Sequence, residues 1–208
     1  FGDRWAGGIK YYIEWMANRV REIHRILKPS GSMFLHCDWH AGHRLRVMLD
    51  EIFGENNFMN EIIWNYGERM MGKSKFFDRK HDTIFFYAKS NNKERTFNKI
   101  TEKYTIEEIR SWRGTKIDKD GREYTLRDGG KGKPRYKAYI DDIMKKGKPL
   151  SDVWNIKIIG SASKERCGYK TQKPLGLIKR IIECSTNQGD LILDCFAGGG
   201  LPPYQRRC

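Results

Sequence analysis

The chain has 208 residues, 38% of them hydrophobic, which is enough for one globular domain with a core of its own. A total of 40 Lys and Arg residues against 26 Asp and Glu residues gives a net charge of +14, a balance that favours a polyanionic partner. These residues show no signal-peptide pattern and no apolar run near the roughly 20 residues of a membrane span, so we expect a cytoplasmic protein without a membrane segment.

Helix and strand patterns alternate over the first 88 residues. Apolar residues at helical spacing predict a helix over 11–27 and a second helix over 41–52. Runs of apolar, aromatic and β-branched residues predict strands at three places, 32–37, 58–66 and 83–88. This order favours an α/β sheet with crossover connections.

The composition changes over residues 89–150, where apolar residues become less frequent and charged residues more frequent. Residues 69–150 contain 23 Lys and Arg against 12 Asp and Glu, so +11 of the net +14 lies there. We expect short helices at 106–112 and 139–144. Basic residues interleaved with aromatic ones suit contacts to phosphates and bases, although a solvated charged face is the usual fate of such runs. The candidate DNA-binding residues are Arg113, Arg127, Lys131, Lys133, Arg135 and Lys137.

Residues 168–200 contain the most informative pattern. Pro174 suits the first turn of a helix, and the apolar residues that follow it at helical spacing bury one face. Residues 191–193 form a wholly apolar run, which predicts a short buried parallel strand. That run ends in Asp194 and a glycine-rich loop. Such a loop at the carboxyl end of a parallel strand lets a ligand approach the backbone closely, although a plain tight turn gives the same glycines.

The five cysteines are scattered and include no Cys-x-x-Cys pair. Cys37, Cys184 and Cys195 lie in apolar helix or strand patterns, so we expect them to be reduced and buried.

The turn of Thr171, Gln172, Lys173 and Pro174 is followed by the pattern Asp-x-Phe-x-Gly-x-Gly, which starts at Asp194. In these two motifs the chain resembles the DNA amino-methyltransferases that methylate adenine N6 or cytosine N4. The order resembles the permuted one of type III modification subunits. The resemblance implies a Rossmann-like α/β core with a partial sheet, S-adenosylmethionine as cofactor and double-stranded DNA as substrate. It implies adenine N6, which we favour, or cytosine N4 as the target. It also allows a homodimer or a restriction subunit as partner.

The same resemblance divides the chain into four segments. Residues 1–88 are expected to be the remainder of the catalytic half, 89–150 a basic target-recognition insert, 151–200 the cofactor-binding half and 201–208 an atypical tail. The cofactor-binding residues that it implies are Thr171, Lys173, Pro174, Asp194, Phe196, Gly198 and Gly200. A helix N-terminus and an ammonium group both attract the carboxylate of the cofactor, which agrees with the role implied for Lys173.

No catalytic residue is assigned. The resemblance implies an Asp/Asn/Ser-Pro-Pro-aromatic loop, which the permuted order places upstream of Phe1, so we expect the chain to be inactive by itself. Leu201, Pro202, Pro203 and Tyr204 have Leu where that loop requires a polar group, and we do not assign them a catalytic role.

Two further readings stay open. His36, Asp38 and His40 share one face of an extended strand, and two imidazoles with a carboxylate suit zinc or iron in a metal-dependent hydrolase. We assign no metal, because the strand is expected to end near Asp38, which puts His40 in the helix entry, and no second ligand cluster is apparent. The resemblance gives another account, in which His36, Asp38 and His81 line the target-base cleft. The other alternative is a non-catalytic DNA-binding module with a decayed α/β core.

Overall fold

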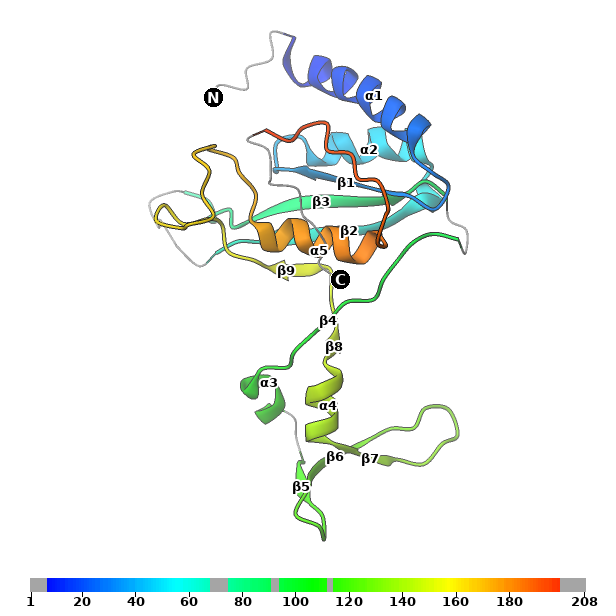
Figure 1. The fold of residues 1–208 in the computed structure, drawn as a ribbon, viewed down its shortest axis with the longest axis vertical. Helices are drawn as coiled ribbons and strands as arrows, with labels where there is room; N and C mark the ends of the chain where they lie inside the picture. Colours follow the sequence, from blue (N-terminus) through cyan, green and yellow to red (C-terminus); the bar gives the residue numbers. More distant parts are fainter. Residues whose placement is uncertain (1–6, 68–74, 91–93, 112–113, 199–208) are drawn as a thin grey trace. The chain divides into compact units, whose positions relative to one another are not determined.

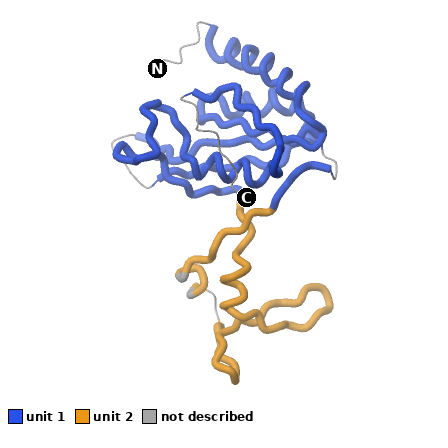
Figure 2. Tube along the Cα trace, viewed as in Figure 1, with its two compact units in different colours: residues 1–98, 152–208 blue, residues 99–151 orange. Residues whose placement is uncertain are grey.

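The computed structural model describes residues 7–67, 75–90, 94–111 and 114–198. The chain divides into two compact units, which Figure 2 shows in different colours. The core unit comprises residues 1–98 and 152–208, and the second unit comprises residues 99–151. The second unit thus begins at Lys99, whereas the change of composition begins at Lys89.

A four-stranded mixed sheet forms the centre of the core unit (Figure 1). Its strands in spatial order are β1 (Ser32–Cys37), β3 (His81–Ala88), β2 (Phe58–Asn65) and β9 (Val153–Asn155). β3 runs antiparallel to both β1 and β2, and only β2 and β9 are parallel. The three long strands lie where the sequence predicts them, but the sheet is mixed because β3 reverses direction between its neighbours.

Helices cover both faces of this sheet. α1 (Gly8–Ile26) and α2 (Gly42–Phe53) lie on one face, and α5 (Leu175–Ser185) lies across the other, near β2 and β9 (Figure 1). A single turn of 3-10 helix, η1 (Glu55–Asn57), leads from α2 into β2. The fully buried residues Val20, Leu45 and Leu49 belong to the cluster under α1 and α2, where truncation to Ala costs about 2–5 kcal/mol for a leucine.

The burial of β3 explains why its sequence is almost wholly apolar. Phe85 and Tyr87 belong to the cluster under α1 and α2, whereas Ile84 and Phe86 face the side of α5. A strand covered on both faces reads as a continuous apolar run instead of alternating with polar residues. The polar residues of β3, His81, Asp82 and Thr83, therefore lie at its N-terminal end.

The second unit consists of short elements. β5 (Lys116–Ile117), β6 (Glu123–Arg127) and β7 (Tyr136–Tyr139) form a three-stranded antiparallel sheet, and β4 (Thr101–Glu102) pairs with β8 (Lys148–Pro149). The two helices that the sequence predicts are α3 (Ile106–Arg110) and α4 (Ile140–Lys146). The β6–β7 hairpin has no counterpart in the sequence-based prediction, because its strands are short and lack an apolar run.

Two predictions about the C-terminal segment are wrong. Residues 191–193 form no strand and pair with none among the described residues, and Leu191 is 91% exposed. An apolar run becomes a strand only when a neighbouring backbone offers hydrogen bonds, and no described strand does so here. Cys195, expected to be buried with that strand, is accordingly exposed, whereas Cys37 and Cys184 are buried as predicted.

Arg113, Gly200 and residues 201–208 lie outside the described residues. Within the described part of the chain, no helix is both long enough and apolar enough to cross a membrane.

Candidate functional site

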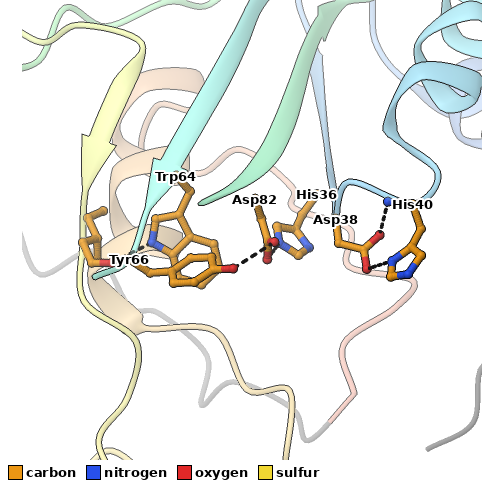
Figure 3. Close-up of polar contacts among 7 residues, drawn as sticks. His36, Asp38, His40, Trp64, Tyr66 and Asp82 are labelled. Atoms are coloured by element: carbon orange, nitrogen blue, oxygen red, sulfur yellow. Dashed lines mark hydrogen bonds and ion pairs between the residues drawn. The ribbon is translucent and has the colours of Figure 1, made fainter. Parts of the chain in front are cut away.

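Polar and aromatic side chains gather at one edge of the sheet, where β1 and β2 end and β3 begins. Because β3 is antiparallel to its neighbours, its first residues lie beside the last residues of β1 and β2. Figure 3 shows His36, Asp82 and Tyr66 side by side along this edge, with Trp64 next to them. The register pairs Trp64 with Asp82, which brings these residues together from distant positions in the chain.

Asp82 is the shared acceptor at this edge. Its carboxylate lies 2.9 Å from His36 Nε2 and accepts a 3.4 Å hydrogen bond from the Tyr66 hydroxyl (Figure 3). Burial of Asp82 works against the charged form, but hydrogen bonds from His36 and Tyr66 and the charges of His36 and Lys173 outweigh it, so the pKa of Asp82 is lowered. The carboxylate is therefore ionised at neutral pH, and it places a negative charge inside the site.

Trp64 forms a rigid aromatic wall beside Asp82. It is only 3% exposed, and its indole Nε1 donates a 2.7 Å hydrogen bond to the carbonyl oxygen of Ile156. The rings of Tyr66 and His36 lie edge-on to it at centroid distances of 5.2 and 5.7 Å. The ammonium of Lys173 lies 5.7 Å from the centroid of the indole ring, within reach of a cation–π attraction.

Lys173 lies in the turn that leads into α5. Burial lowers the pKa of its ammonium group, and the nearby charge of Asp82 acts in the opposite direction. The same turn is held by local contacts from residues 165–172. The amide of Leu175 at the start of α5 donates to the Glu165 carboxylate, and Gln172 bonds the backbone of Glu165 and Cys167. The orientation of the turn is therefore fixed from one side by Glu165 and Gln172.

A pocket of about 240 Å³ opens at this turn. It brings residues 171–173 together with residues 194–198, which are separated by the whole of α5. The walls are His36, Tyr169, Thr171, Gln172, Lys173, Ile178, Asp194, Phe196, Ala197 and Gly198.

The 194–198 wall of this pocket is shaped by a tight turn. The Asp194 side chain accepts a 3.1 Å hydrogen bond from the amide of Phe196, and the ring of Phe196 lies 6.2 Å from that of Trp15 on α1. Gly198 has a φ of +60°, and a Cβ atom there would lie 2.6 Å from Cε1 of Tyr169. Glycine at this position therefore serves both the backbone conformation and the close approach of Tyr169.

A second pocket, of about 310 Å³, lies on the other side of the same turn. It shares Tyr169, Thr171, Gln172 and Lys173 with the first pocket. The other walls are Trp64, Tyr66, Asp82, the basic residues Arg166 and Lys170, and the apolar residues Ile158 and Ile159. Lys173 therefore contacts both pockets, with the carboxylate of Asp82 on one side and the 194–198 turn on the other.

The structure places the predicted cofactor residues as follows. Thr171, Lys173, Asp194, Phe196 and Gly198 line the first pocket. Pro174 is buried immediately before α5 and does not line it.

The predicted cleft residues are dispersed. His36 lines the first pocket, but Asp38 bonds His40 instead, with 2.7 Å between Asp38 Oδ2 and His40 Nδ1. His81 is exposed at the start of β3. The described residues include no group of three or more His, Cys, Asp or Glu side chains suited to a metal ion, so the hydrolase alternative gains no support.

Of the predicted DNA-binding residues, Arg127 ends β6, Lys137 lies in β7, and Lys131, Lys133 and Arg135 lie in the loop between them. These five basic residues therefore belong to one hairpin of the second unit. All but Arg127 are exposed. The ammonium of Lys137 lies 4.6 Å from the ring centroid of Tyr124.

Sequence reasoning missed Asp82, Trp64, Tyr66 and Tyr169 as site residues. For Asp82 a signal existed, because side chains alternate along a strand and position 82 shares a face with Ile84 and Phe86, whereas His81 does not. The roles of Trp64 and Tyr169 depend on pairing between distant segments and left no local signal.

Comparison with known proteins gives a match to the DNA methylase family model over residues 5–201. The relatives include the type II methyltransferase M.HpaI of Haemophilus parainfluenzae, 26% identical over 91% of this chain, and the DNA adenine methyltransferase YhdJ of Escherichia coli K12, 27% identical over 90%. The Mod subunit of the type III restriction-modification enzyme StyLTI of Salmonella typhimurium is 23% identical over 91% of the chain. The matches cover 50%, 56% and 37% of these relatives, so the chain spans about half their length or less.

Proposed function

The chain belongs to the N6/N4 DNA methylase family, and from that premise we propose that it binds S-adenosylmethionine in the first pocket and DNA beside it. One observation carries the proposal. The pocket joins the turn of Lys173 to the turn of Asp194, Phe196 and Gly198, two segments that are separated by α5 in the sequence. Together they offer a cation, a carboxylate, an aromatic ring and a glycine with close backbone approach.

Each of these groups matches a part of the cofactor. The Lys173 ammonium suits the methionine carboxylate, and Asp194 suits hydrogen-bonding or cationic groups of the ligand. Phe196 offers a ring face for adenine, and Gly198 keeps the wall free of a side chain that would meet Tyr169. The bound cofactor would supply an electrophilic methyl group. The negative charge of Asp82 would offset the positive charge of Lys173.

DNA is the proposed substrate. The exposed basic residues of the β6–β7 hairpin suit phosphate contacts, which provide affinity that does not depend on base sequence. The relative YhdJ is named as an adenine methyltransferase, which supports adenine N6 over cytosine N4 as the acceptor. A type III Mod subunit among the relatives supports a restriction subunit as a partner.

We do not assign the catalytic loop to these residues. The sequence contains one Pro-Pro-aromatic segment, at residues 202–204, and Leu201 precedes it where a polar side chain is required. We therefore propose that these 208 residues bind cofactor and DNA without transferring the methyl group by themselves.

Calorimetric titration of the 208-residue chain with S-adenosylmethionine tests the cofactor assignment. We expect one binding site, which Lys173→Ala weakens at least tenfold because the variant removes the cation. Lys179→Ala is the matched control, since Lys179 lies on α5 with its side chain 52% exposed and pairs only loosely with Glu183 at 3.7 Å. No measurable binding would contradict the proposal and favour a module that binds DNA alone, whereas equal affinity in both variants would show that Lys173 does not hold the cofactor.

A further inference from the structure

A stack of aromatic and cationic side chains stands on the surface of the core unit, next to the site. The guanidinium carbon of Arg79 lies 3.8 Å from the ring centroid of Trp39 and 4.7 Å from that of Phe76. The ring of His40 is also stacked on Trp39, at a centroid distance of 3.7 Å. We call these four residues, Phe76, Arg79, Trp39 and His40, the surface stack.

The stack and the adjacent Phe77 leave large aromatic rings exposed to solvent. Trp39 is 52% exposed, Phe76 is 61% exposed, and the adjacent Phe77 is 97% exposed. Isolated exposed aromatics need no explanation, but several large rings in one patch mark an interaction surface.

The charge around the rings indicates which partner fits. Lys75 and Arg79 are exposed, and Lys80 is half-buried in the same segment, which contains one acidic residue, Asp78. Rings interleaved with cations suit nucleic acid, because bases stack on aromatic faces and phosphates pair with Lys and Arg. A protein surface would need acidic groups spaced between apolar ones to match the same pattern.

The stack is tied to the pocket edge through short connections. Asp38 holds His40 by two contacts, 3.0 Å to its amide and 2.7 Å to Nδ1, and Asp38 is two residues from His36, which lines the first pocket (Figure 3). On the opposite strand, the amide of Tyr66 donates a 3.1 Å hydrogen bond to the carbonyl oxygen of Lys80. A nucleotide on the stack would therefore lie beside the edge that carries Asp82 and Tyr66.

We propose that the surface stack and Phe77 form a platform for an unstacked base of the DNA, adjacent to the nucleotide that enters the site. Arg79 and Lys75 would hold the flanking phosphates. This inference rests on the proposed function, because it takes DNA as the substrate. It assigns part of the DNA contact to the core unit, in addition to the hairpin of the second unit.

Photocrosslinking to DNA that carries 5-iodouracil locates the contact directly. Duplexes with the substituted base unpaired in a short bulge are irradiated with the 208-residue chain, and the crosslinked residue is identified by mass spectrometry. We expect crosslinks at Trp39, Phe76 or Phe77.

Matched variants measure how much each aromatic ring contributes to DNA affinity. Phe77→Ala should weaken binding of the bulged duplex about tenfold, the range of one lost base–aromatic stack. Trp39→Ala should also weaken it, because the indole supports Arg79 and His40 in the stack, while Trp39→Phe should retain most of the affinity. Tyr11→Ala, which truncates an exposed aromatic ring on α1, serves as the control. Thermal melting of each variant shows whether the fold is retained.

The outcomes separate the two claims. DNA binding with crosslinks confined to residues 99–151, and with unchanged affinity in Trp39→Ala and Phe77→Ala, would overturn the platform and leave the proposed function standing. Absence of any DNA binding by the chain would overturn both. Capture of an acidic protein in preference to DNA would likewise contradict the platform.

Discussion

His36 on β1 and Asp82 on β3 are joined by a contact of 2.9 Å between His36 Nε2 and Asp82 Oδ2, across 46 positions of sequence. The pair links two antiparallel strands at the edge where the pockets open. It also keeps a negative charge beside Lys173, which lines both pockets. Several consequences of this arrangement are measurable.

Asp82→Ala should lower the free energy of unfolding by about 1–3 kcal/mol at pH 7, because it leaves the half-buried donors of His36 and Tyr66 without their acceptor. The pKa of Asp82 is depressed in the folded state, so its stabilising contribution is present above the ordinary value of 3.8 and is lost as the pH falls through the lowered value. Urea denaturation at pH 7 and at pH 3 measures the free energy of unfolding, and the difference in that free energy between wild type and Asp82→Ala should be smaller at pH 3. Glu51→Ala, at an exposed position of α2, is the control.

Loss of the proton from Lys173 should weaken cofactor binding at high pH, and we call the pH at which affinity falls the alkaline limit. The pKa of Lys173 lies below 10.5 because of burial, so affinity for a carboxylate should fall as the pH rises through that lowered value. Asp82→Asn removes the charge that opposes the shift and should move the limit to lower pH. Lys173→Arg should abolish the limit, because guanidinium stays charged. Titration calorimetry from pH 7 to pH 10 measures all three proteins, and the comparison cancels ionisation of the ligand itself. A limit at the same pH in all three would show that Lys173 does not hold the carboxylate.

Gly198→Ala should weaken cofactor binding about tenfold, since a Cβ atom there meets Tyr169 at 2.6 Å and φ is +60°, a region that costs an L-residue roughly 1–2 kcal/mol. Gly160→Ala is the matched control, because its Cβ would meet nothing within 4 Å. Equilibrium binding of S-adenosylmethionine compares the two, and equal affinities would show that the 194–198 turn does not form the wall of the ligand site.

Cysteine alkylation should report on cofactor binding without a mutation. Burial raises the pKa of Cys37 to about 12 and that of Cys184 to about 11, so both should resist iodoacetamide at pH 8. Cys167 and Cys195 are exposed and should react, although burial raises the pKa of Cys195 and should slow its reaction. Because Cys195 adjoins Asp194 in the pocket wall, S-adenosylmethionine should slow its alkylation severalfold and leave Cys167 unchanged, as mass spectrometry of each peptide would show. Equal rates with and without ligand would place the cofactor elsewhere.

The hairpin of the second unit should contribute to DNA affinity through charge. Replacing Lys131 and Lys133 together by Ala should reduce the slope of log K against log salt by about 1.8 if each contacts one phosphate. Lys145 and Lys146, two exposed lysines at the end of α4, provide a control pair of equal charge. Fluorescence anisotropy measures the slope between about 50 and 200 mM salt, the range over which phosphate contacts lose most of their affinity. A slope that changes equally in both double variants would indicate general charge attraction instead of a contact by the hairpin.

The sequence by itself determined the local elements of the core and the motifs that connect them to a family. Apolar, aromatic and β-branched runs predicted strands over 32–37, 58–66 and 83–88, which the structure has at 32–37, 58–65 and 81–88. The helices α1, α2 and α5 follow from apolar residues at helical spacing. The turn before α5 and the glycine turn after Asp194 could also be predicted from the sequence. Proline restricts the backbone and glycine allows it more conformations, whatever the distant contacts are.

Only the tertiary structure decided how these elements meet. It placed β3 antiparallel between β1 and β2, and so made Asp82, not His81, the partner of His36. It also left residues 191–193 outside the sheet, although their apolar composition predicts a buried strand. The physical reason is the same in both cases. Composition and periodicity depend on a segment alone, whereas strand pairing and side-chain contacts depend on which distant backbone offers the hydrogen bonds.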